Sequence, residues 1–134
     1  MIHTTLIKVR GYHCDAYGHI NNARYLELLE EARWSFLEDL NALTYWEENG
    51  LGLVVVSVTI NYRRPMKPQG TVEIKSFMKG ITGKSAVIHQ DVENAATGKV
   101  VADADVTFAV ISLATGRSVP LEGAVRDIFG PDHD

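Results

Sequence analysis

Asp15 stands shortly before a stretch with helical periodicity, in the segment D-A-Y-G-H-I-N-N-A-R-Y at 15–25. The first N–H groups of a helix have no intrahelical acceptor, and the helix dipole makes this end positive. Such an end stabilises developing negative charge, while a nearby carboxylate can activate water or attack a carbonyl carbon. An acid beside a helix start therefore predicts an acyl-transfer site.

A long helix is expected to present this site. Asn21 or Asn22 is a suitable N-cap, and the helical pattern extends from Ala23 to Leu40. The residues expected near one face are Leu26, Leu29, Arg33, Phe36, Leu37 and Leu40. Further apolar residues lie outside this stripe, so we expect other structure to cover the helix widely.

Five segments are typical of strands, because they alternate in polarity or are rich in β-branched residues. The first covers 5–9, and the others lie near 54–63, 71–79, 85–92 and 100–111. Turn-forming clusters at 65–70, 80–83 and 94–98 separate the later four, which predicts an antiparallel meander. The order predicts an α+β fold in which one antiparallel sheet covers one central helix.

The composition narrows the class of protein. A chain of 134 residues with 46% hydrophobic content can form one compact domain, so residues 1–134 are expected to be a single domain. The net charge of -4, without long runs of either sign, disfavours binding to nucleic acid or to an anionic membrane.

The cysteine content and the apolar runs indicate a cytoplasmic protein. Cys14 is the only cysteine, which excludes an internal disulfide and a multi-cysteine zinc site and suits a reducing compartment. The longest apolar run, 53–56, is far shorter than the ~20 residues of a membrane-spanning helix, so no membrane insertion is expected.

Two other interpretations of the Asp15 region are open. The carboxylate can simply cap a turn or the helix. His13, Cys14, Asp15 and His19 also suggest a metal cluster or a Cys-His nucleophile. On a strand, however, Cys14 and Asp15 would point to opposite faces and could not easily bind one ion, so we expect a buried, unreactive Cys14 and no metal.

Several segments resemble the hotdog-fold acyl-CoA thioesterases of the 4-hydroxybenzoyl-CoA thioesterase and YbgC-like family. The segments are D-A-Y-G-H-I-N-N-A-R-Y-L-E at 15–27, V-R-G-Y-H-C-D at 9–15, E-E-A-R-W at 30–34, N-Y-R-R-P at 61–65 and G-K-S at 83–85. They are most similar to the long-chain acyl-CoA thioesterases of bacteria. The resemblance implies the hotdog fold, in which a five-stranded antiparallel sheet wraps a long central helix. It also implies a homodimer with a continuous sheet, or a homotetramer, with active sites at the dimer interface.

The resemblance also implies roles for individual residues. Asp15 would be the catalytic carboxylate, acting as nucleophile or as general base, and the backbone N–H of Asn22 would stabilise the oxyanion. Tyr25, with Leu29 and Val56, would line the tunnel for the acyl chain. The phosphates of CoA would meet Arg64, Lys84 and Ser85.

These roles predict hydrolysis of medium- to long-chain fatty acyl-CoA to free fatty acid and CoA, without a metal or organic cofactor. Two alternatives stay open, since one fold can host several activities. The first is a hydroxyacyl thioester dehydratase, and the second is a non-catalytic acyl-CoA binding protein. The sequence leaves open the preferred chain length and unsaturation, the chemical role of Asp15, the contacts to the CoA nucleotide, and dimer versus tetramer.

Overall fold

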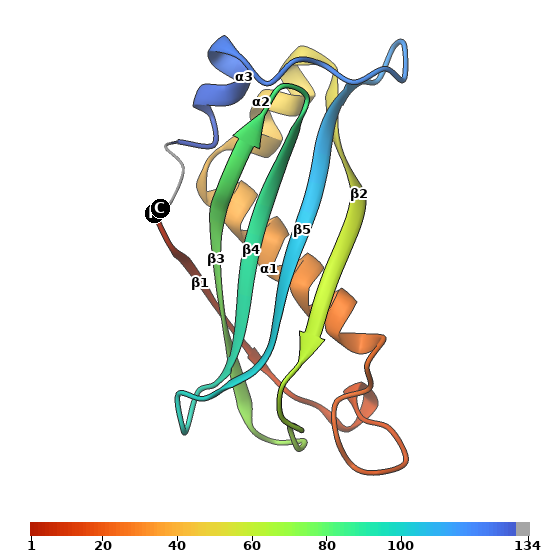
Figure 1. The fold of residues 1–134 in the computed structure, drawn as a ribbon, viewed down its shortest axis with the longest axis vertical. Helices are drawn as coiled ribbons and strands as arrows, with labels where there is room; N and C mark the ends of the chain where they lie inside the picture. Colours follow the sequence, from red (N-terminus) through yellow and green to blue (C-terminus); the bar gives the residue numbers. More distant parts are fainter. Residues whose placement is uncertain (131–134) are drawn as a thin grey trace.

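The computed structural model describes residues 1–130, and Figure 1 shows how their helices and strands are arranged. The elements are β1 (His3–Lys8), the 3₁₀ helix η1 (Gly11–His13), α1 (Arg24–Asp39), α2 (Ala42–Asn49), β2 (Leu51–Tyr62), β3 (Thr71–Thr82), β4 (Ser85–Asn94), β5 (Val100–Ser112) and α3 (Gly123–Asp127). The expected domain extends to residue 134, and 131–134 lie outside the described residues. No described helix has the length and apolar character needed to span a membrane.

The strands form one antiparallel sheet in the order β1-β3-β4-β5-β2. In Figure 1 this sheet curves along one side of the long helix α1. The α+β architecture expected from the sequence, a central helix covered by a five-stranded antiparallel sheet, is confirmed.

The predicted meander is correct only for β3, β4 and β5. Strand β2 pairs with β5 and not with β3, so it forms the edge opposite β1. The connection 63–70 is too long for a tight hairpin, and it runs along the end of the sheet from one edge strand to the other side. One of its carbonyl groups, that of Met66, accepts a hydrogen bond from the segment before α1.

The predicted face of α1 is correct in part, since Leu29, Phe36 and Leu37 are buried, whereas Arg33 and Leu40 are partly exposed. Its buried residues are Tyr25, Leu28, Leu29, Ala32, Phe36 and Leu37, whereas Leu26 is 46% exposed. Apolar residues occur on more than one side of this helix, so the sequence pattern alone did not identify the stripe that faces the sheet. Contact of α1 with β1 and β3 selects the stripe that begins at Tyr25.

The turns lie where glycine and other turn-forming residues predict them, except at Gly80. Gly50 ends α2 with φ of 63°, as its position after the helix predicts. Gly80 was expected to open a turn, but it lies within β3 at a bulge, and the hairpin turn is confined to Gly83 and Lys84.

A buried polar contact attaches α1 to the sheet. Gln90 of β4 is fully buried and donates hydrogen bonds to the Leu29 carbonyl (3.1 Å) and to Ser76 Oγ (3.0 Å). Arg33 donates to Gln90 Oε1 at 3.1 Å. Because unpaired polar groups are costly inside a protein, these bonds fix the position of α1 on the sheet.

Candidate active site

A tight turn presents Asp15. The Gly18 N–H donates to the Asp15 carbonyl at 3.0 Å, and the Asp15 N–H donates to the His19 carbonyl at 2.8 Å. Asp at the first position and Gly at the fourth are typical of such turns, and Gly18 has φ of 76°, which side chains with a Cβ rarely adopt. The spacing of the aspartate and the glycine therefore has a local structural cause.

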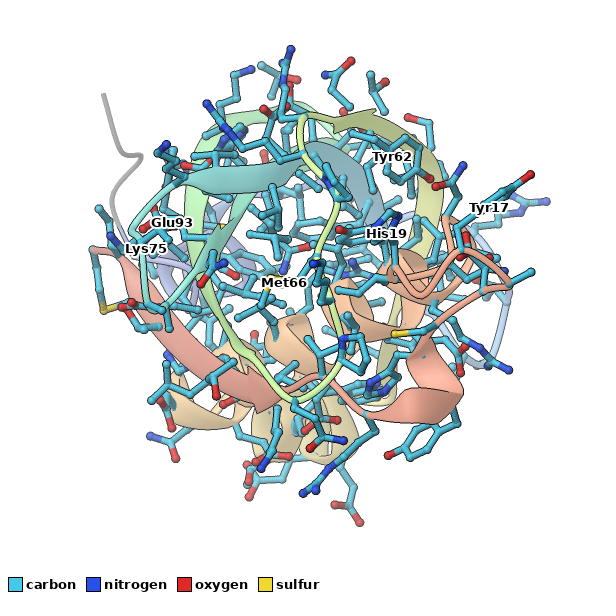
Figure 2. All side chains as sticks on the ribbon, turned by 90° about the horizontal axis from the view of Figure 1, so that it is seen from below. Tyr17, His19, Tyr62, Met66, Lys75 and Glu93 are labelled. Atoms are coloured by element: carbon cyan, nitrogen blue, oxygen red, sulfur yellow. The ribbon has the colours of Figure 1, made fainter. Side chains whose placement is uncertain are left out.

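Two further backbone bonds position this turn against its neighbours. The Asn21 N–H donates to the His13 carbonyl at 2.8 Å and closes the base of the turn. The Ile20 N–H donates to the Met66 carbonyl at 2.9 Å, which ties the turn to the connection that follows β2. Figure 2 shows His19, Tyr62 and Met66 together at this end of the molecule.

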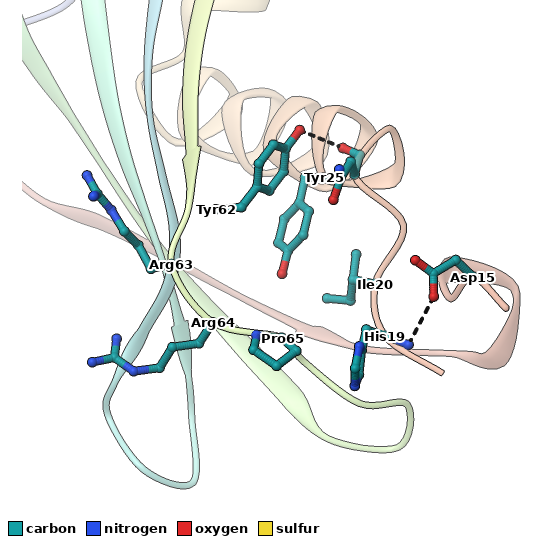
Figure 3. Close-up of a pocket in the computed structure, with 9 residues that line it drawn as sticks. Asp15, His19, Ile20, Tyr25, Tyr62, Arg63, Arg64 and Pro65 are labelled. Atoms are coloured by element: carbon teal, nitrogen blue, oxygen red, sulfur yellow. Dashed lines mark hydrogen bonds between the residues drawn. The ribbon is translucent and has the colours of Figure 1, made fainter. Parts of the chain in front are cut away.

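A pocket of about 260 Å³ lies between the turn, the start of α1 and the end of β2. Its lining residues are Asp15, His19, Ile20, Asn22, Tyr25, Tyr62, Arg63, Arg64 and Pro65, as Figure 3 shows. Four of the predicted site residues, Asp15, Asn22, Tyr25 and Arg64, thus line one pocket.

The Asp15 carboxylate is exposed and has one oxygen available. Oδ1 accepts hydrogen bonds from the N–H groups of Tyr17 (2.9 Å) and His19 (3.4 Å). Within residues 1–130, Oδ2 has no hydrogen-bond donor. Asp15 therefore caps its own turn through Oδ1, and Oδ2 stays free to react in the pocket.

The segment before α1 carries a free N–H group, that of Asn22. The helix begins at Arg24 and its N-cap is Ala23, not Asn21 or Asn22 as expected, so no side chain caps it. Asn21 instead forms a turn just before the helix, in which its Oδ1 accepts from the Ala23 N–H at 2.9 Å. The Asn22 N–H has no acceptor in the described part of the chain. The Tyr62 hydroxyl donates to the Asn22 carbonyl at 3.0 Å and holds this peptide in place (Figure 3).

Tyr62 is the pocket residue that the sequence interpretation missed. Its side chain comes from the last residue of β2, far from Asn22 in the sequence. The one available signal was its place in the N-Y-R-R-P segment, from which only an arginine was selected.

The two arginines after β2 differ in how much of their charge is available. Arg63 binds both carboxylate oxygens of Asp103, at 2.8 and 3.3 Å, and this bonding lowers the pKa of Asp103. Arg64 is exposed and uses Nη1 to donate to the Val100 carbonyl at 2.6 Å. Since a carbonyl carries no net charge, Arg64 is the better cation for a phosphate ligand.

Lys84 and Ser85 lie at the opposite end of the molecule from this pocket. They belong to the turn between β3 and β4 and to the first residue of β4, whereas the pocket lies where β2 ends and β3 begins (Figure 1). A strand rises by about 3.4 Å per residue, so the length of β3 separates them from Arg64 in the same chain.

The neighbouring histidine and cysteine have other contacts. The His13 ring accepts a hydrogen bond from the Arg10 N–H at 2.8 Å, and burial together with the Arg24 charge lowers its pKa. Cys14 is half-buried against the core, and its thiol donates to the Arg10 carbonyl at 3.6 Å. Within residues 1–130, no three His, Cys, Asp or Glu side chains are grouped to bind a metal ion.

A larger apolar groove of about 740 Å³ lies between α1, α2 and β2. Its apolar walls include Trp34, Leu37, Trp46, Leu53 and Val55, and Arg33 also lines it. Helix α2 contacts β2, whereas α1 contacts β1 and β3, and the groove lies between them. The edge strand also exposes apolar side chains outside the groove, with Val56 60% exposed.

The fold and the pocket define a class of protein, the hotdog-fold thioesterases. Residues 9–129 match the thioesterase-like superfamily. The chain therefore belongs to the thioesterase-like superfamily of hotdog-fold enzymes.

Similar proteins agree with this assignment. The long-chain acyl-CoA thioesterase FadM of Escherichia coli (strain K12) is 46% identical over 123 residues, covering 92% of this chain and 93% of FadM. The crystal structure of YbaW, a probable thioesterase from Escherichia coli, has a TM-score of 0.88 at 45% identity, with 93% and 94% of the two chains covered. SAV2348 from Staphylococcus aureus, solved in complex with CoA, shares the fold with a TM-score of 0.86 at 14% identity, over 96% of this chain and 81% of SAV2348.

Proposed function

We propose that this enzyme hydrolyses medium- to long-chain fatty acyl-CoA to free fatty acid and CoA. One observation carries the proposal: the pocket combines the free Oδ2 of Asp15 with the free N–H of Asn22 at the positive end of α1. The similarity to FadM, a long-chain acyl-CoA thioesterase, supports this choice of substrate.

In the proposed reaction, the thioester carbonyl oxygen accepts a hydrogen bond from the Asn22 N–H. Asp15 then either removes a proton from an attacking water or attacks the carbonyl carbon itself, and both routes form an oxyanion near the start of α1. Collapse of this oxyanion breaks the C–S bond and releases CoA. A water molecule completes the second route by hydrolysing the acyl-aspartate.

The phosphates of CoA would lie near Arg64. Its guanidinium is exposed at the rim of the pocket, and Lys67 follows in the same connection. Lys84 and Ser85 are remote from the pocket of their own chain, so their proposed contact with CoA requires a second copy of the protein.

The acyl chain would occupy the apolar groove of a second subunit. Strand β2 is an edge strand with exposed valines, which favours antiparallel pairing with β2 of another copy. If the symmetry axis lies near the middle of Leu51–Tyr62, the end of β2 that borders the pocket lies beside the Leu51–Val55 half of the partner, where the groove is. A volume of about 740 Å³ is within the usual range for ligand sites.

The proposed dimer would therefore complete each active site with the groove of the other chain. A tetramer would form from two such dimers. A cytoplasmic location stays a prediction, which rests on the single cysteine.

Thiol release from acyl-CoAs of increasing chain length tests the reaction and the substrate together. The wild-type protein should release CoA fastest from medium- or long-chain substrates, and Asp15→Asn should lose at least ~99% of this activity, as expected for loss of an acid-base or nucleophilic group. Asp127→Asn is the matched control, because Asp127 is an exposed residue of α3 at the other end of the molecule.

Three results would reject the proposal. The first is full activity in Asp15→Asn. The second is formation of an enoyl product without thiol, which would indicate a dehydratase. The third is binding of acyl-CoA that survives long incubation intact, which would indicate a binding protein.

A further inference from the structure

The Tyr25 side chain is almost completely buried, and among residues 1–130 its hydroxyl group has no hydrogen-bond partner. Only 3% of the residue is exposed, and its ring packs on Tyr62 with 5.5 Å between the ring centroids. The hydroxyl oxygen itself is not fully enclosed, because Tyr25 lines the pocket. In Figure 3 the hydroxyl end points away from the helix into the pocket, toward Ile20 and Pro65.

The ring is therefore enclosed by the protein, while the hydroxyl is available to a ligand in the pocket. Tyr25 is the second residue of α1, and side chains in a helix lean toward its N-terminus. The hydroxyl therefore points toward the same end of the helix as the free Asn22 N–H. The Tyr25 hydroxyl and the Asn22 N–H thus both belong to pocket residues near the start of α1, and neither has an acceptor among residues 1–130.

The hydroxyl can donate but does not act as a base at neutral pH. Burial, with smaller effects from Tyr62 and Cys14, raises the pKa of Tyr25 to about 12. The phenol consequently keeps its proton at neutral pH.

We propose that the Tyr25 hydroxyl is a catalytic residue, which donates a hydrogen bond to the thioester carbonyl oxygen together with the Asn22 N–H. This inference rests on the proposed function. As water or Asp15 adds to the carbonyl carbon, the C=O π electrons move to the oxygen, and both donors stabilise the oxyanion without transferring a proton. The electrons then return and the C–S bond breaks. When water is the nucleophile, the departing sulfur takes the proton that Asp15 removed from this water; when Asp15 is the nucleophile, the sulfur leaves as thiolate and takes its proton from solvent, and water then hydrolyses the acyl-aspartate.

The Tyr25→Phe variant removes only the oxygen atom. The contact of the ring with Tyr62 remains, and no hydrogen bond within the protein is lost, so the melting temperature should stay at the wild-type value. The kcat for long-chain acyl-CoA should fall by about a hundredfold with little change in KM, as for the loss of one oxyanion donor. Tyr45→Phe, on α2 at the far end of the molecule, is the matched control and should keep wild-type kcat.

Two non-hydrolysable ligands measure the hydrogen bond directly. An S-(2-oxoalkyl)-CoA carries a carbonyl group and cannot release thiol, whereas the S-alkyl-CoA of equal length has no carbonyl. Tyr25→Phe should weaken binding of the first about fivefold to tenfold and leave the second unchanged, because one neutral hydrogen bond is lost.

Wild-type kcat in Tyr25→Phe, or equal effects on the two ligands, would overturn the inference and leave Tyr25 as a wall of the acyl site. If the protein is not an acyl-CoA thioesterase, the result is different, because the wild-type protein itself then releases no thiol from acyl-CoA.

Discussion

Replacing Gly18 with alanine tests whether the turn around Asp15 is needed for activity. Gly18 has φ of 76°, and a Cβ added there would meet nothing within 4 Å. The penalty therefore comes from the backbone conformation alone, at roughly 1–2 kcal/mol for a residue with a Cβ in this region. We expect the melting temperature to fall by roughly 3–8 °C, from the usual scaling for a domain of this size.

The same energy should reduce activity, because it favours other conformations of the segment that carries Asp15. A penalty of 1–2 kcal/mol changes the ratio of two conformations by roughly 5- to 30-fold. We therefore expect kcat/KM for palmitoyl-CoA to fall by about this factor in a thiol-release assay, with melting measured on the same preparation.

Gly116→Ala is the matched control. Gly116 has φ of 72°, and a Cβ there would also meet nothing within 4 Å, but it lies in the turn after β5, away from the pocket. It should lose the same stability and keep wild-type kcat/KM. Equal activity in the two variants, or an unchanged melting temperature in Gly18→Ala, would refute the link between this turn and catalysis.

Two other substitutions probe the groove and the outer face of the sheet. Leu53→Trp should fill part of the groove and reduce hydrolysis of palmitoyl-CoA at least ~tenfold relative to hexanoyl-CoA. The control Leu6→Trp lies outside both cavities and should leave the ratio of the two activities unchanged. An equal loss of activity on both substrates in Leu53→Trp would contradict the assignment of the groove to the acyl chain. Burial opposes the charged form of His89, but hydrogen bonds to Asp105 (2.7 Å) and Asp91 (2.9 Å) outweigh it and raise its pKa. Because the pKa of His89 is raised on folding, the protonated His89 stabilises the folded state. This contribution is complete below the ordinary pKa of 6.5 and is lost as the pH rises through the folded-state pKa. The melting temperature should therefore fall from about pH 6 to about pH 9 in the wild type and less in His89→Gln, whereas identical pH profiles would exclude this source.

Local features of the site could be predicted from the sequence. The Asp15 turn depends on an aspartate that caps its own backbone and on a glycine with positive φ, both within five residues of each other. The strands follow from alternation and β-branched residues, whereas the expected N-cap at Asn21 or Asn22 is wrong, because Ala23 precedes the helix. The roles assigned to Asp15 and Asn22 went beyond these patterns and came from the family resemblance.

Only the tertiary structure decided which distant segments meet. The turn at Asp15 needs only its own residues, but the contact of Tyr62 with Asn22 exists because β2 ends beside the start of α1. In the same way, the order of the strands brings Arg64 to the pocket and carries Lys84 to the other end of the sheet. Hydrophobic periodicity predicts that one face of an element is buried, but it does not identify the element that packs against this face, because the hydrophobic effect is non-directional. The pairing of strands, in turn, depends on the whole set of strands in the sheet.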